Sequence, residues 1–337
     1  MTVISPIRPW RGSLERLWWA GRALRKEVLG FRFDYPIETV AAAGPKDSLH
    51  YYIYSEDLFF DAMKLDAHGI PVHRARTFGT TYNPAYVGWY GLVDVERYAR
   101  GLDPSRAFLR QVEWLVSHAV RRDDGAVVWP YTAVFEEGHG LLKPPWICAM
   151  AQGLAMSLLV RGYRATGRPE LLDLCQPATR VFEKSLEDGG VRTLEDGYAL
   201  YEEYPVYPLP RVLDGFLFSL LGLHDVAAQT GDQQVRQLFD EGVAGLRHTL
   251  ESWNYRNKWS WYGSHGYLCP PHYNKLNAAL LASLARLTGD ATLRRYAGAW
   301  DPTRLTRAGQ VEVFLVFFFT KNMSRLRHRT WRRRATS

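Results

Sequence analysis

The feature that most constrains the fold is a helical hairpin pattern that occurs four times. In each copy a long apolar helix is predicted to end at a glycine, and a second helix begins at the Asp or Pro that follows. The glycines are Gly101, Gly167, Gly231 and Gly289, which lie 66, 64 and 58 residues apart. Repeated antiparallel helix pairs with long return loops are typical of an α/α toroid. We therefore predict a mainly α fold, an incomplete α/α toroid of four hairpins over residues 82–320.

The segments on either side of the helical repeats have other patterns. Within a first segment, 1–30, residues 13–29 place apolar side chains on one helical face and arginines mostly elsewhere, which predicts a basic amphipathic helix. Such a helix packs on its own protein or lies on an anionic membrane. Residues 31–81 contain short aromatic and β-branched runs between Gly and Pro, which predicts small β-hairpins. Residues 321–337 form a basic tail, either a frayed end or an attachment to acidic glycan or lipid.

Composition and charge limit the class of partner. The chain has 337 residues, a formal net charge of +7 and 14% aromatic residues. A basic protein favours an anionic ligand, and aromatic side chains stack on sugar rings. The basic residues are scattered and form no recognition motif, so no nucleic-acid partner is expected. We predict an anionic polysaccharide partner and a homodimer, with the N-terminal helix and the apolar run 311–319 as interface segments.

Several sequence signals are missing. The N-terminus lacks the continuous apolar stretch of a signal peptide, and the run 311–319 is too short to span a bilayer. We expect a cytoplasmic protein that lies at the inner face of the membrane if its N-terminal helix binds lipid. Cys148, Cys175 and Cys269 have neither disulfide-framework nor zinc-site spacing. No metal or other cofactor is expected.

The return loops between the helical hairpins carry unusual chemistry. They are rich in Trp, Tyr, Glu, His and Arg, and a toroid would bring them to one rim. The second loop contains YEEYPVYP at 201–208, where two acids lie among tyrosines and the prolines exclude a helix. We expect Glu203 to be partly buried among these rings and Glu202 to face solvent.

Four segments together resemble the D-glucuronyl C5-epimerase family. They are GIPVHRARTFGTTYNPAYVGWYGL at 69–92, WICAMAQGLAMSLLVRGYRATG at 146–167, YEEYPVYPLPRVLDGFLFSLLGLHD at 201–225 and WSWYGSHGYLCPPHYNKLNAALLASLARLTGD at 259–290. The AMAQG and EEYP blocks are the specific ones. The resemblance implies a short, prokaryotic-type isomerase that inverts carbon 5 of D-glucuronate in heparosan-type polysaccharides, the chemistry of heparan sulfate biosynthesis, and gives L-iduronate.

The resemblance also implies a catalytic set. The glutamate and tyrosine of the family's EEYP motif match Glu203 and Tyr204. A later family tyrosine matches Tyr262 in SWYG, and another, which precedes an apolar helix, matches Tyr273 in HYNKLN. Tyr267 is the alternative to Tyr273 if a gap falls between them.

The third loop departs from the family pattern. Gly263 stands where the family has an aspartate, and Asn274 and Asn277 stand where it has histidines. These differences leave the N-substituent of the polymer and its flanking sugar open.

Inversion of a carbon next to a carboxylate requires two acid/base groups on opposite faces of the sugar. Burial among tyrosines is expected to raise the pKa of Glu203 toward neutrality, where a carboxylate is a competent base. Tyr273 is the expected proton donor on the other face, and it needs nearby positive charge when it acts as a phenolate. The candidates for that charge are Arg256, Lys258, His265, His272 and Lys275.

Further residues are predicted to bind the substrate. Preorganised donors must neutralise the charge of the intermediate. The candidates besides the tyrosines and His272 are Gln152, Arg211 and Asn274. The rings predicted to carry the polymer are Trp129, Trp146, Trp259 and Trp261. Asn83 is predicted first as a helix N-cap and second as a substrate contact.

Two other functions share these features. A polysaccharide lyase begins with the same proton removal at carbon 5 and then expels the 4-linked sugar, and α/α toroids can host that reaction. A non-catalytic protein that binds acidic glycans would also be basic and rich in aromatic residues. A lyase releases unsaturated ends, whereas an epimerase incorporates solvent deuterium at carbon 5 without shortening the chain.

Overall fold

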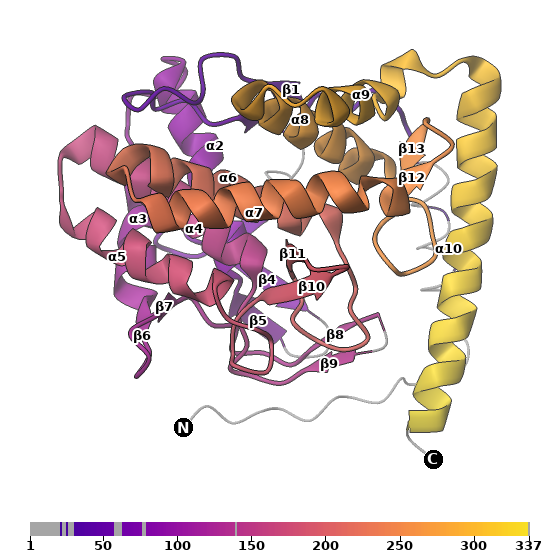
Figure 1. Cartoon of the computed structure of the whole chain (residues 1–337), viewed down its shortest axis with the longest axis horizontal. Coiled ribbons are helices and arrows are strands. Elements are labelled where there is room, and N and C mark those ends of the chain that lie inside the picture. The colour runs from indigo at the N-terminus through magenta and orange to yellow at the C-terminus, as the bar shows by residue number, and fades with distance from the viewer. Residues whose placement is uncertain are drawn as a thin grey trace.

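The computed structural model describes most of the chain, namely residues 30–56, 63–75, 79–138 and 140–335 with Gly21 and Arg25. This part of the protein is mainly helical and contains small antiparallel sheets (Figure 1). Apart from Gly21 and Arg25, the predicted amphipathic helix at 13–29 lies outside the described residues, so it stays a prediction.

Four helical hairpins follow one another, as the glycine pattern predicted. The first helices are α2 (Pro84–Ala99), α4 (Ala149–Thr166), α6 (Leu213–Thr230) and α8 (Pro271–Thr288). The second helices are α3 (Leu109–His118), α5 (Glu170–Ala178), α7 (Gln233–Thr249) and α9 (Ala291–Ala299). Gly167, Gly231 and Gly289 cap α4, α6 and α8 with φ of 74°, 74° and 73°. Glycine adopts this left-handed conformation at little steric cost, so the first helices end there.

The first helices of the hairpins pack side by side in chain order. α2 contacts α4, α4 contacts α6 and α6 contacts α8, and each second helix packs on its own partner. Glycines allow the closest approach, because a Cβ on Gly222 of α6 would lie 2.4 Å from the Cα of Gly153 on α4. Both helices are buried on nearly all sides, which fits their almost continuous apolar sequences.

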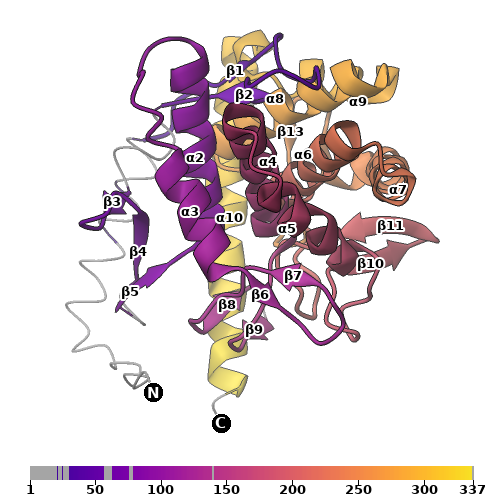
Figure 2. The same cartoon turned by 90° about the vertical axis from the view of Figure 1, so that its left-hand side faces the viewer.

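The segment before the hairpins contains the short strands that the sequence predicted. β1 (Glu38–Thr39) pairs with β2 (Ile53–Tyr54), and both strands contact α8. A three-stranded antiparallel sheet follows, formed by β3 (Lys64–Leu65), β4 (Pro71–Ala75) and β5 (Gly79–Tyr82). Figure 2 shows β1 and β2 at one end of the helical array and the strands β6 to β9 of the first return loop at the other.

Each return loop contains short antiparallel strands, which were not predicted. The pairs are β6 (Val120–Arg121) with β7 (Val127–Val128), β8 (Phe135–Glu137) with β9 (Gly140–Leu142), β10 (Arg192–Glu195) with β11 (Tyr198–Tyr201), and β12 (Asn254–Tyr255) with β13 (Trp259–Ser260). Short 3-10 turns are η1 (Thr179–Phe182), η2 (Leu250–Trp253) and η3 (Pro302–Arg304). Asp196 and Gly197 connect β10 to β11 with φ of 51° and 84°. An Asp-Gly pair is a sequence signal for such a two-residue turn.

The last helix, α10 (Arg307–Ala335), runs along one side of the molecule (Figure 1). It continues without a break across residue 320, where the sequence placed the start of the basic tail. Its outer surface exposes Val311, Leu315 and Phe319 by 58, 59 and 66%. The hypothesis that this run lies in a subunit interface stays a prediction. Within the described ranges, no helix has the length and apolar character needed to cross a membrane.

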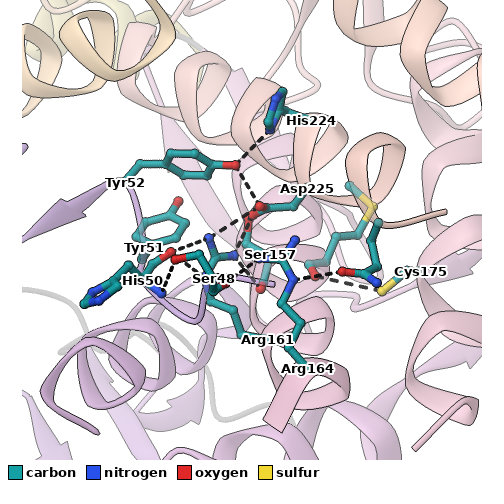
Figure 3. Close-up of polar contacts among 12 residues, drawn as sticks. Ser48, His50, Tyr51, Tyr52, Ser157, Arg161, Arg164, Cys175, His224 and Asp225 are labelled. Atoms are coloured by element: carbon teal, nitrogen blue, oxygen red, sulfur yellow. Dashed lines mark hydrogen bonds and ion pairs between the residues drawn. The ribbon is translucent and has the colours of Figure 1, made fainter. Parts of the chain in front are cut away.

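A buried polar network ties the residues around β2 to the helices (Figure 3). Arg161 of α4 and Asp225 of α6 form an ion pair of 2.6 Å, and their side chains are 0 and 2% exposed. The hydroxyls of Tyr52 and Ser157 each donate to Asp225 at 2.7 Å. Arg161 also donates to the carbonyl of His50 at 3.0 Å. The network therefore joins α4, α6 and the N-terminal strand segment around one ion pair.

The same segment bridges the first and last of the side-by-side helices. The main-chain N–H of Tyr51 donates to Glu96 of α2 at 2.9 Å. On the other side, Ser283 of α8 donates to the carbonyl of Tyr52 at 3.0 Å. Residues 50–54 therefore connect α2 to α8.

Candidate active site

Glu203 lies in the loop between β11 and α6 and is 7% exposed. Its Oε2 has no hydrogen-bond partner among the described residues. The side chain lies against the first turn of α6, where a Cβ on Gly215 would be 2.5 Å from this oxygen. Burial and then the charge of Asp214 raise the pKa of Glu203 well above its usual value, and a hydrogen bond with Tyr204 opposes the shift. The raised pKa of Glu203 agrees with the direction predicted from the sequence.

Asp214 is a second acid at this place, and it was not predicted as a site residue. It is the second residue of α6, it is 4% exposed, and its Oδ1 has no hydrogen-bond partner among the described residues. Burial raises its pKa to about 7, and its own backbone amide opposes the shift. In the sequence Asp214 resembles any acid in the first turn of a helix, where the dipole favours it. Its burial beside Glu203 is what distinguishes it from an ordinary first-turn acid.

The structure brings the three predicted tyrosines to Glu203. Burial raises the pKa of Tyr204, Tyr262 and Tyr273, and the charge of Glu203 contributes to the shift of all three. The ring centroids of Tyr262 and Tyr273 are 5.7 Å apart. The four residues that the family resemblance assigned to catalysis therefore form one cluster.

Tyr267, the alternative to Tyr273, lies on the far side of Tyr262. The two rings stack with centroids 5.3 Å apart, and the Lys321 ammonium of α10 lies 3.7 Å from the centroid of the Tyr267 ring. Burial and then Glu137 raise the pKa of Tyr267. Asp214 also contributes to the raised pKa of Tyr267. The pKa of Tyr273 is raised by burial and then by Asp214, Tyr86 and Glu203, so both acids of the site act on Tyr273.

The cluster lies where the N-terminal ends of the four first helices meet. Tyr86 is the third residue of α2, Cys148 is the N-cap of α4, and Tyr273 is the third residue of α8. After burial, the charge of Glu203 raises the pKa of each of these groups. Helix N-termini carry partial positive charge and free N–H donors, so this arrangement favours an anionic ligand. Tyr86 and Cys148 were not predicted, because their proximity depends on how the helices pack.

Glu202 does not face solvent, and that expectation is wrong. It is 2% exposed and accepts hydrogen bonds from Arg211 at 2.6 Å and from Thr193 of β10 at 2.7 Å. Arg211 also lies 3.1 Å from Glu195. The cation that was predicted to bind substrate therefore compensates a buried carboxylate of the protein.

The positive charges expected around Tyr273 are mostly bonded to acids of the protein. These pairs are Arg256–Glu312 at 3.2 Å, Lys258–Glu312 at 2.6 Å, Lys275–Asp301 at 3.1 Å and His265–Glu137 at 2.6 Å. His272 does contact the tyrosine, with ring centroids 4.3 Å apart. The positive potential at Tyr273 therefore comes from the helix N-termini, whereas it was expected from these cationic side chains.

Four predicted substrate-binding residues lie in the core. Trp129, Gln152, Trp259 and Asn274 are 1, 0, 0 and 0% exposed. The indole of Trp129 donates to the carbonyl of Leu115 at 2.8 Å, and Asn274 accepts from the hydroxyl of Ser260 at 2.9 Å. Gln152 accepts from one main-chain amide and donates to two carbonyls. These side chains hold the loops around the site and use their polar atoms within the protein.

Other predicted binding residues lie closer to the cluster. Trp146 stacks on Tyr131 with centroids 3.9 Å apart, and its ring centroid lies 6.1 Å from that of Tyr204. Asn83 is the N-cap of α2, which confirms the first of its two predicted roles, and its Oδ1 also accepts from the hydroxyl of Tyr131 at 3.0 Å. Trp261 packs edge-on against Tyr255 in a second apolar cluster that includes residues of α10, and Tyr262 and Tyr273 pack against the same cluster.

A histidine and a glutamate connect the first and third return loops beside the site. The Nε2 of His265 lies 2.6 Å from Glu137 of β8, and the charge of Glu137 adds to the raised pKa of Asp214. Cys148, Cys175 and Cys269 are buried free thiols. In the described part of the chain, no group of three or more His, Cys, Asp or Glu side chains could hold a metal ion.

The fold and the site together define a mainly helical protein with a buried acid–base cluster at the N-terminal ends of its helices. A family model described as "D-glucuronyl C5-epimerase C-terminus" matches residues 122–302, more than half of the chain. The protein therefore belongs to the D-glucuronyl C5-epimerase family. The matched region includes Glu203, Asp214 and the three site tyrosines.

Two curated proteins are similar over much of the chain. A D-glucuronyl C5-epimerase from Caenorhabditis elegans is 29% identical over 214 residues, which are 58% of this chain and 34% of the worm protein. An uncharacterized protein from Methanocaldococcus jannaschii is 27% identical over 212 residues, which are 61% of this chain and 68% of the archaeal protein. The match thus spans about a third of the length of the worm enzyme.

Proposed function

We propose that the protein is an epimerase that inverts carbon 5 of D-glucuronate residues in a heparosan-like polysaccharide and gives L-iduronate. The observation that supports this most directly is that Glu203 is buried among Tyr204, Tyr262 and Tyr273 and that its Oε2 has no hydrogen-bond partner in the described part of the chain. Membership of the epimerase family supports the same reaction. The anionic glucuronate fits a site at helix N-termini.

In the proposed reaction, Glu203 breaks the carbon 5–hydrogen bond and takes the proton. The electron pair of that bond moves into the uronate carboxylate, where Tyr204 and Tyr262 are placed to donate hydrogen bonds to the added charge. Tyr273 then gives its hydroxyl proton to the opposite face of carbon 5. Its raised pKa keeps the phenol protonated until that step. Exchange with water returns the proton from Glu203 to solvent and restores Tyr273.

We also propose that the four helical hairpins form an incomplete α/α toroid. The neighbour order α2, α4, α6, α8 supports this arrangement, as does the meeting of their N-terminal ends around Glu203. Residues 50–54, which bond to both α2 and α8, lie where such a ring would otherwise be open.

The protein is expected to incorporate solvent deuterium at carbon 5 of a glucuronate polymer in heavy water without shortening the chain. NMR of the recovered polymer and gel filtration measure the two effects across N-acetylated, N-sulfated and unmodified glucuronate polymers. Unsaturated ends that absorb in the ultraviolet would instead identify a lyase. Binding without exchange on every polymer would favour a glycan-binding protein.

Replacing Tyr273 by Phe is expected to lower this exchange by about 10²–10⁴-fold, because it removes the proton donor on the second face. Tyr267→Phe is the matched control, since Tyr267 lies behind Tyr262 against Lys321. That variant should keep exchange within about tenfold of the parent, a small part of the 10²–10⁴-fold typical of an acid/base group. A larger loss in Tyr267→Phe than in Tyr273→Phe would reverse the assignment.

Gly215→Ala is expected to displace Glu203 and to abolish most of the exchange. The added Cβ would lie 2.5 Å from the Cβ and Oε2 of Glu203, so the carboxyl must move. Unfolding should change little, because the helix propensity of Ala offsets roughly 1 kcal/mol of an overpacking cost of about 1–3 kcal/mol. Gly309→Ala is the control, since a Cβ there meets neighbours at 3.4 Å or more. Unchanged exchange in Gly215→Ala would contradict the placement of Glu203.

A further inference from the structure

Two acids lie unpaired in the interior of the site. Glu203 lies against Gly215, and Asp214 is the residue next to that glycine at the start of α6. They are 7 and 4% exposed, and each has one carboxyl oxygen without a hydrogen-bond partner among the described residues. Two adjacent buried carboxylates repel each other, and burial adds a large cost for each charge.

The neighbouring acid shows how this chain compensates a buried charge. Glu202 is 2% exposed, and its carboxylate accepts hydrogen bonds from Arg211 and Thr193. Among the described residues, no cation contributes to the pKa shift of Glu203 or of Asp214. Burial therefore does not account for the missing cation, because the same loop supplies Arg211 to Glu202, the residue before Glu203.

The groups that act electrostatically on the pair come from every element around it. They are Glu137 of β8, Tyr86 of α2, Cys148 at the start of α4, Tyr273 of α8, Tyr131, and Tyr204, Tyr262, Tyr267 and Cys269 of the loops. Glu137 is itself bonded to His265. The others are phenols and thiols whose burial keeps them neutral, so none of these side chains in the described part of the chain is a cation, and a proton lowers the charge of the pair directly.

We propose that Glu203 and Asp214 form a carboxyl pair that shares one proton, and that Asp214 is a positioning residue that sets the pH at which Glu203 accepts a proton. The pair then carries one negative charge in place of two, which reduces its repulsion of an anionic uronate. Two coupled carboxyls lose their protons in two separate steps that belong to the pair.

The consequence for catalysis rests on the proposed function. When Glu203 takes the proton from carbon 5, the electrons of the broken bond stay on the substrate and a new O–H bond forms on Glu203. The pair then holds two protons and is neutral while the substrate carries its additional charge. Asp214 contacts the reaction only through Glu203.

The test is a titration of the whole chain with 13C-labelled Asp and Glu carboxyls, followed by NMR without any polymer. In the unmodified protein, the signals of Glu203 and Asp214 should each respond to two titration steps. In Asp214→Asn, the Glu203 signal should follow a single step about one pH unit or more lower, because its charged neighbour is gone. Glu203→Gln should have the same effect on Asp214, and it serves if the first variant fails to fold.

Asp94→Asn is the matched control. Asp94 is also a buried acid, 9% exposed, whose pKa burial raises to about 6, but the groups that act on it are Arg97, Asp103 and Arg110. Its replacement should remove one signal and leave Glu203 unchanged. Independent single-step titration of Glu203 and Asp214 in the unmodified protein would overturn the inference, as would a Glu203 signal that does not move in Asp214→Asn.

A second readout separates this inference from the proposed epimerase. The acidic limb of the pH profile for deuterium exchange should move to lower pH in Asp214→Asn, by the same shift as the Glu203 signal. Coupled titration without exchange on any glucuronate polymer would support the carboxyl pair and reject the epimerase. Exchange without coupled titration would support the epimerase and reject the pair.

Discussion

Glu203→Gln is expected to lower deuterium incorporation at carbon 5 by about 10²–10⁴-fold, the usual effect of removing a general base. The amide has nearly the shape of the carboxyl but cannot accept the proton. Because the replacement also removes a buried acid whose Oε2 has no hydrogen-bond partner among the described residues, the fold should be at least as stable. Exchange is measured by NMR of the polymer, and folding by urea unfolding.

Glu202→Gln provides the adjacent control. Glu202 is equally buried, but both of its partners belong to the protein, so it has no role in proton transfer. This variant should lose stability, because Arg211 keeps its charge while the carboxylate is gone, and its folded fraction should exchange at close to the parent rate. If Glu202→Gln lost exchange and Glu203→Gln kept it, Glu202 and not Glu203 would be the base.

Asp225→Asn is expected to lower the free energy of unfolding by about 3–5 kcal/mol, because it leaves the fully buried Arg161 without its counter-charge. Burial opposes ionisation of Asp225, but Arg161 and Arg164 outweigh it and lower the pKa of the carboxyl below its usual value. The stabilisation is therefore complete above about pH 4, the unfolded pKa, and is lost as the pH falls through the folded one. Urea unfolding at pH 7 and at lower pH measures both effects.

An exposed ion pair serves as the control for this prediction. Arg236 and Asp240 of α7 lie 3.0 Å apart, with side chains 55 and 57% exposed. Asp240→Asn should therefore change the unfolding free energy by at most about 1 kcal/mol. Equal losses in Asp240→Asn and Asp225→Asn would show that the buried network does not hold the β2 segment to α4 and α6.

The helical hairpins were predictable because their signals are local. A glycine in the left-handed conformation caps α4, α6 and α8, whereas Arg100 caps α2 and the left-handed Gly101 follows it. Continuous apolar sequence marks α4 and α6 as helices buried on most sides. The strands of the return loops were missed because each is only two to four residues long. Such short runs have no periodicity to detect, although Asp196-Gly197 indicated one turn.

The site was predicted in part, through the family motif. EEYP and the later tyrosines identified Glu203, Tyr204, Tyr262 and Tyr273, which the fold brings together. The polar and aromatic residues around them were harder to assign. Gln152 resembled a substrate donor and is a core residue that bonds to the main chain, because composition does not reveal which way a side chain points.

Local sequence thus determined where the helices begin and end and which residues could exchange protons. The tertiary structure decided which charged groups surround those residues. Glu202 and Glu203 are neighbours with the same side chain, yet one meets Arg211 and the other meets Asp214. The pKa of a buried carboxyl depends on nearby charges, and here these are Arg211 in the loop before α6, Asp214 of α6 and Glu137 of β8, which only the folded chain brings together.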